Sequence, residues 1–187
     1  MSVLNRDFEV VNELHWNAIK LVKFRLPWLL MGVAISAVGS FMVSRFEHTL
    51  SANLSLAFFI PMIVYLSDAV GTQTETMYIR YLSAHRTDQF WKYLFKEIRV
   101  GLPLGIILGT LTGLIAFIWL RSVDTALTVG FAMLCNITIA PMVALVIPEI
   151  LFKEHNDPAL GGGPFTTVIQ DFVSLLIYFS IATLIIF

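Results

Sequence analysis

Long apolar runs dominate the chain from residue 28 onward, and short segments that carry most of the charged residues separate them. The runs cover residues 28–45, 53–76, 98–120, 126–151 and 165–187. Each is close to the roughly 20 residues that a helix needs to cross the hydrocarbon core of a bilayer. The pattern predicts an all-α integral membrane protein with five transmembrane helices and no soluble domain beside them.

The segment before the first run has a different pattern. Between residues 6 and 24, charged residues alternate with apolar ones at helical spacing, namely Phe8, Val11, Leu14, Ile19 and Val22. Such an amphipathic helix lies in the membrane interface rather than across it. A frayed polar tail is the alternative. We expect two parts, a cytoplasmic amphipathic helix over residues 1–26 and a five-span domain over residues 27–187.

Composition supports the membrane assignment. Charged residues make up 13% of the chain, about half of their share in soluble domains, and the mean hydropathy is +0.80. We therefore expect a multi-pass protein of the cell membrane (inner or plasma membrane), in contact with lipid and not with nucleic acid.

The positions of Lys and Arg predict the orientation, because these residues accumulate on the cytoplasmic side. With the N-terminus inside, only Arg45 and Arg121 lie outside. The cytoplasmic side then holds the other ten: Arg6, Lys20, Lys23, Arg25, Arg80, Arg86, Lys92, Lys96, Arg99 and Lys153. Five spans place the C-terminus at the outer face.

Glycine marks one face of the third run. Gly101, Gly105, Gly109 and Gly113 recur at intervals of four, so one side of this helix carries no side chains. A neighbouring helix can pack closely against such a face. Glycines scattered by chance in a membrane helix are the alternative.

Two prolines lie inside other runs. Pro61 and Pro141 each remove a backbone hydrogen bond and would free the carbonyls of Ala57 and Ile137. Freed carbonyls can coordinate a cation, and a simple kink is the alternative use.

Four acids fall within or at the ends of the spans: Asp68, Glu75, Glu149 and Asp171. In the predicted topology all four lie in the cytoplasmic half, and no basic residue within a span neutralises them. Unpaired carboxylates suit Mg²⁺, which prefers oxygen ligands and keeps several of its waters. The alternative is that these acids touch water at the interface, which applies least to Asp171, seven residues after Pro164.

Features of enzymes are missing from the sequence. The four histidines lie outside the spans, no H-E-x-x-H motif occurs, and the glycine run at residues 161–163 lacks the Lys and Ser/Thr of a phosphate-binding loop. The lone Cys135 lies in an apolar run and cannot form an intrachain disulfide. We expect no enzymatic activity and no cofactor, with Mg²⁺ present only as a transported ion.

Several motifs resemble the transmembrane domain of the MgtE family of magnesium transporters. They are Arg25-Leu-Pro-Trp28, Ala57-Phe-Phe-Ile-Pro61, Gly71-Thr-Gln73 followed by Arg80, and Asp157-Pro-Ala followed by Gly163-Pro-Phe-Thr-Thr and Asp171. The resemblance runs in order from about residue 21 to the end. It does not extend to the acidic helical domain and the CBS pair that are typical of the bacterial family, so this chain looks like a stand-alone transmembrane domain.

The resemblance implies a homodimer with one cation pore on its two-fold axis, lined by the second and fifth spans of both subunits. It implies that Asp171 binds the hydrated Mg²⁺, and the further candidate metal ligands are Asp68, Glu75, Thr72 and Thr167. One departure concerns the second span. Where the family usually reads Gly-Gly-Asn-x-Gly-Thr-Gln, this chain reads Ser-Asp-Ala-Val-Gly-Thr-Gln over residues 67–73.

Three functional hypotheses remain. The first is transport of a divalent cation, with Mg²⁺ as the default ion, and the second is a carrier coupled to Na⁺ or H⁺. The third is a membrane scaffold subunit that transports nothing. We further hypothesise that Asp68, Glu75 and Glu149 bind cytoplasmic cation weakly and lower the flux as internal Mg²⁺ rises.

Overall fold

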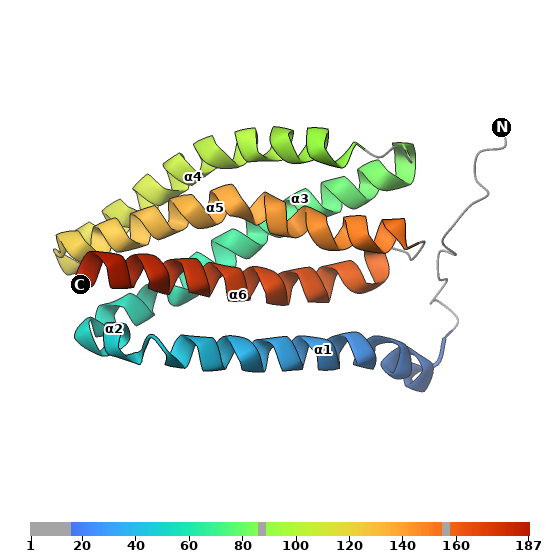
Figure 1. The fold of residues 1–187 in the computed structure, drawn as a ribbon, viewed down its shortest axis with the longest axis horizontal. Coiled ribbons are helices and arrows are strands. Elements are labelled where there is room, and N and C mark those ends of the chain that lie inside the picture. The colour runs from blue at the N-terminus through green and yellow to red at the C-terminus, as the bar shows by residue number, and fades with distance from the viewer. Residues whose placement is uncertain (1–15, 86–88, 155–157) are drawn as a thin grey trace.

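The computed structural model describes residues 16–85, 89–154 and 158–187, and these residues form a bundle of long helices (Figure 1). The elements in order are α1 (Ala18–Ser44), α2 (Glu47–Ala52), the 3-10 helix η2 (Leu54–Phe59), α3 (Ile60–His85), α4 (Phe90–Leu120), α5 (Val123–Lys153) and α6 (Pro158–Ile186). Within the described residues, five segments are long and apolar enough to cross a membrane, which confirms the prediction of an all-α protein with five candidate spans.

The long helices alternate in direction, so each end of the bundle gathers one set of helix termini (Figure 1). One end holds the start of α1, α4 and α6 and the end of α3 and α5. The basic residues near this end include Lys20, Arg80, Lys92 and Lys153, whereas Arg45 and Arg121 lie at the opposite end. The charge asymmetry predicted from the sequence is therefore reproduced by the fold.

Helix bounds differ from the predicted runs mainly at the basic end. Helix α3 continues to His85 and α4 begins at Phe90, so the predicted basic connection is largely helical. Helix α6 begins at Pro158 and includes the glycine run, which the sequence had placed before the span. Asp171 therefore lies near the middle of its helix, and not only seven residues from its start. The helix ends beyond the apolar runs contain polar residues, and a hydropathy pattern detects only the apolar part of a helix.

The prediction that Pro61 frees the carbonyl of Ala57 is wrong. Pro61 is the second residue of α3, where a missing backbone N–H disturbs no helical hydrogen bond. The carbonyl of Ala57 instead accepts a hydrogen bond from the N–H of Ile60, at the end of the 3-10 helix.

Helix α1 runs without a break from Ala18 to Ser44 and contains Pro27. Its first turns are set at an angle to the rest of the helix (Figure 1), as a proline kink explains. The predicted interfacial helix and the predicted boundary after residue 26 thus fall in part on this continuous helix, and residues 1–15 lie outside the described residues. Helix α1 packs chiefly on α6.

The glycine ladder packs α4 against α5, the most extensive helix pair of the fold. A Cβ atom built on Gly101, Gly105, Gly109 or Gly113 would lie 3.1, 2.8, 2.7 or 3.1 Å from a backbone carbonyl oxygen of α5. The two backbones are therefore in contact along four turns. This confirms the predicted close approach and excludes a chance distribution of glycine.

Candidate metal-binding site at the junction of α3 and α6

A polar stripe on α6 joins this helix to α3 and to the 3-10 helix. Its members recur every four residues and are all buried: Thr166, Gln170, Ser174 and Tyr178. The Thr166 hydroxyl donates to a Glu75 carboxylate oxygen at 3.3 Å, and the Tyr178 hydroxyl donates to the Leu56 carbonyl at 2.7 Å. Residues four apart lie on one helix face, so the stripe sets the rotation of α6 against its neighbours.

The middle of this stripe forms a buried network with Ser67 of α3. Gln170 Nε2 donates to Ser67 Oγ at 2.7 Å, and Ser174 Oγ donates to the same oxygen at 2.8 Å. From α5, Asn136 Nδ2 donates to the Ser174 carbonyl at 3.3 Å. All four residues are at most 1% exposed. Three helices thus meet at one polar point inside an apolar bundle, which holds them in a single register.

Asp68 and Asp171 each follow a residue of this network in the sequence, and both are half-buried. Asp171 lines a cavity of about 390 Å³ between α1 and α6, together with Ser36 and Ser40. Neither aspartate has a hydrogen bond or an ion pair within the described part of the chain. Two carboxylates without a partner among the described residues therefore lie within long helices, Asp171 near the middle of α6 and Asp68 in the first half of α3.

Two other carboxylates are buried and, among the described residues, hydrogen-bonded only to threonine. Glu75 of α3 is 4% exposed and accepts from Thr166, and Glu97 of α4 is 5% exposed and accepts from Thr74 Oγ1 at 3.5 Å. No cation pairs with either acid in the described residues. Both lie closer to the basic end of the bundle than Asp68 does.

Glu149 differs from the other acids because its charge is compensated. Its Oε2 accepts from the Tyr78 hydroxyl at 2.6 Å, and its Oε1 lies 2.9 Å from Lys153 Nζ. The expectation that no basic residue within a span neutralises the acids is therefore wrong for Glu149, since α5 continues far enough to include Lys153 one turn later. Glu149 fastens α5 to α3 and is not available for a cation.

The remaining candidate ligands flank the two aspartates. Thr72 is exposed on α3, and Thr167 is half-buried on α6, four residues before Asp171. Within the described residues, no three His, Cys, Asp or Glu side chains come together as a set that could hold a metal ion. A single chain thus offers isolated carboxylates, which suit an ion that keeps its water shell better than a dehydrated one.

Glu97 and the α6 stripe are not among the residues predicted from the sequence. Glu97 stands one residue before the predicted start of the third apolar run, so the hydrophobic pattern places it in a connection. The stripe carried a signal that could have been used, since Thr166, Gln170, Ser174 and Tyr178 recur every four residues in an otherwise apolar segment. That spacing predicts one polar face on the helix, although not its partner.

The family model described as MgtE, divalent cation transporter, matches residues 60–181. This range includes α3 to α5 and most of α6, and therefore both unpaired aspartates.

Three relatives named magnesium transporter MgtE are similar to this chain. The protein of Enterococcus faecalis is 32% identical over 180 residues, that of Bacillus subtilis 34% over 161 residues, and that of Thermus thermophilus 32% over 163 residues. These alignments include 95%, 85% and 86% of this chain but only 39%, 36% and 36% of the relatives. The chain thus spans less than two-fifths of their length.

Together the five apolar helices and the family match identify a multi-pass membrane protein, and members of the matched family are transporters rather than enzymes. The resemblance seen in the motifs of the sequence is thereby confirmed. The chain belongs to the MgtE family of divalent cation transporters.

Proposed function

We propose that this protein carries divalent cations, with Mg²⁺ as the default ion, through a membrane pore in which Asp171 binds the hydrated ion. The observation that carries the proposal is the state of Asp171, a carboxylate near the middle of a transmembrane helix with no protein partner in the described residues. A charged side chain at this depth costs at least about 3 kcal/mol in lipid, so it needs water or a cation beside it. The names of the relatives favour Mg²⁺ as that cation.

The pore is proposed to lie on the two-fold axis of a homodimer. The face of α3 that carries Asp68 also presents Tyr65, Thr72 and Thr76, all three exposed on the single chain. A stripe of this polarity is poorly solvated by lipid, whereas a second copy of the chain would cover it and double the number of acids around the ion. Mg²⁺ is commonly held by one or two carboxylates while it keeps several waters, which matches a pair of Asp171 side chains.

A coupled carrier is the second candidate, and the burial of Glu75 and Glu97 favours it. Each is a carboxyl group inside the bundle with a threonine hydroxyl as its sole bonded partner in the described residues. A buried carboxyl without a cation is a natural place for a proton in a proton-driven transporter. Uptake that stops when an imposed proton gradient is collapsed would favour this mechanism, and uptake driven by membrane potential alone would favour a channel.

The decisive experiment is divalent cation uptake into vesicles that contain the purified protein. We expect Asp171→Asn to reduce uptake to the level of empty vesicles, because the neutral amide no longer attracts the ion, while the elution volume of the protein is unchanged. Asp124→Asn is the matched control, since Asp124 is an exposed acid in the first turn of α5. Uptake of Asp171→Asn at the wild-type rate would refute the assignment.

A further inference from the structure

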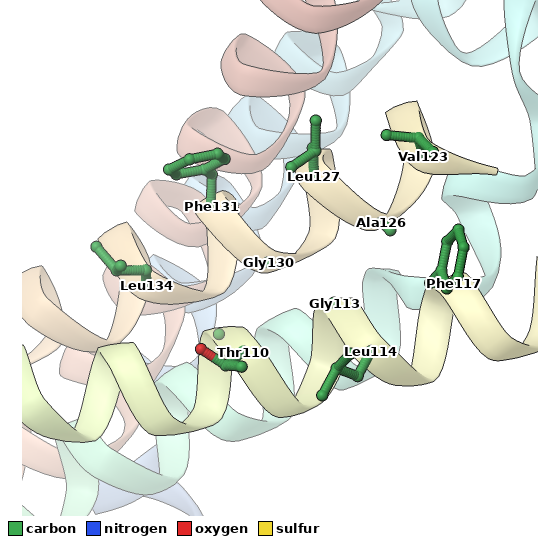
Figure 2. A pocket seen from close by; sticks show the side chains of 11 residues that line it. Thr110, Gly113, Leu114, Phe117, Val123, Ala126, Leu127, Gly130, Phe131 and Leu134 are labelled. Carbon is green, nitrogen blue, oxygen red and sulfur yellow. The ribbon is translucent and has the colours of Figure 1, made fainter.

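An apolar groove of about 410 Å³ lies between α4 and α5, away from α1, α3 and α6 and thus from the proposed pore. Figure 2 shows its lining, with Phe117 and Val123 at one end and Leu134 at the other. The lining is apolar except for Thr110, whose hydroxyl donates to the Ile106 carbonyl of its own helix at 2.7 Å. The side chains of the groove therefore offer a ligand no free hydrogen-bond donor.

The groove begins at the end of the bundle where α4 is joined to α5 and runs inward along both helices. On α4 it extends from Phe117 back to Gly109, about 12 Å along the helix axis. On α5 it extends from Val123 to Leu134, about 16 Å, so the groove is about half as long as the roughly 30 Å hydrocarbon core is thick. Near the same end of α4, the exposed Trp119 packs against Phe58 and Phe59 of the 3-10 helix and does not line the groove.

Arg121 stands at the same end, in the short connection between the two helices that line the groove. It is exposed, and no carboxylate pairs with it in the described residues, although the exposed Asp124 follows three residues later. Its φ of 54° makes it the one non-glycine residue with a positive φ among those the structure describes. Glycine or asparagine usually occupies this position after a helix, because other side chains are strained there.

We propose that the groove binds an anionic phospholipid, whose phosphate contacts Arg121 and whose acyl chain lies against α4 and α5. The arrangement matches the two halves of such a molecule, a cation at headgroup depth and an apolar channel that leads inward from it. Phosphate binding also explains why arginine occupies a position that usually holds glycine. A guanidinium pairs with phosphate through two parallel hydrogen bonds, and glycine has no side chain to do so.

The test measures lipid binding to the purified protein by native mass spectrometry, with phosphatidylglycerol and phosphatidylcholine of identical acyl chains. We expect the wild type to prefer phosphatidylglycerol by about fivefold, the factor expected for one favourable arginine contact. Arg121→Gly should abolish this preference and at the same time raise the melting temperature in lipid-free detergent, because glycine relieves the strained φ. Arg45→Ala, which removes the other described arginine at this end, should keep the preference.

A second variant tests the acyl chain. Leu127 is 46% exposed and lines the groove, so Leu127→Trp should fill it and reduce the binding of both lipids. Ile107→Trp is the control, since Ile107 is exposed on α4 outside the groove.

Three results would overturn the proposal. One is a preference for phosphatidylglycerol that survives Arg121→Gly, and another is equal loss of that preference in Arg45→Ala. The third is lipid binding by Leu127→Trp at the wild-type level. If this variant also changes the number of subunits, the groove is an interface between copies of the chain and not a lipid site.

Discussion

Replacing one glycine of the α4 ladder by alanine tests the closest packing in the fold. In Gly105→Ala the new Cβ would lie 2.8 Å from the Leu134 carbonyl oxygen and 3.0 Å from Thr138 Oγ1. In Gly109→Ala it would lie 2.7 Å from the Gly130 carbonyl oxygen. Carbon–oxygen contacts of this type are normally about 3.3–3.6 Å long, so the two helices must separate by roughly half an ångström or more.

The cost follows from that separation. Forcing a methyl group into a well-packed contact typically costs about 1–3 kcal/mol, and the higher helix propensity of alanine returns about 0.5–1 kcal/mol. The net loss is about 1 kcal/mol for either glycine, or roughly 2–4 °C in melting temperature for a chain of this size. Gly105→Leu, whose longer side chain has no space against the same carbonyl, should lose about 3 kcal/mol or more.

Thermal unfolding in detergent, followed by loss of the monodisperse elution peak, measures this effect. Gly163→Ala is the matched control, because no atom lies within 4 Å of the added Cβ in α6. It should leave the melting temperature unchanged or raise it. If Gly105→Ala and Gly109→Ala also raise the melting temperature, the carbonyl contacts do not limit the packing of α4 on α5 and the explanation of the ladder fails.

Three further predictions concern orientation, internal packing and regulation. A cysteine at Ser83, in a variant that lacks the native cysteine, should not react with an impermeant reagent added outside intact cells, and labelling there would reverse the topology. Tyr78→Phe removes the hydrogen bond to the charged Glu149 and should destabilise the fold by about 1.5–3 kcal/mol in a denaturation assay, whereas a smaller change would mean that Lys153 suffices. Internal Mg²⁺ should slow wild-type uptake, and this inhibition should disappear in Asp68→Asn combined with Glu75→Gln; inhibition of equal strength in the double variant would exclude these acids from gating.

The sequence alone determined the number of spans and the asymmetry of charge. Both can be worked out from one segment at a time. Insertion of a helix depends on the summed transfer free energies of its own residues, and its orientation depends on the Lys and Arg residues beside it. The contact face of α4 could also be predicted, because four glycines at intervals of four residues lie on one face of the helix, where another backbone can approach closely. Asp171 stood out for the same local reason, as an acid within an apolar run.

Only the tertiary structure decided which acids have partners. Glu149 accepts a hydrogen bond from Tyr78, which lies 71 residues away in the sequence, and Glu97 is buried because α4 begins before its apolar run does. The Ser67 to Gln170 hydrogen bond spans 103 residues and joins α3 to α6 at the residues that directly precede Asp68 and Asp171. Such pairings depend on how far each helix is rotated and shifted against the others. Packing of the whole bundle sets this rotation and shift, so the pairings cannot be predicted from the hydropathy of one helix.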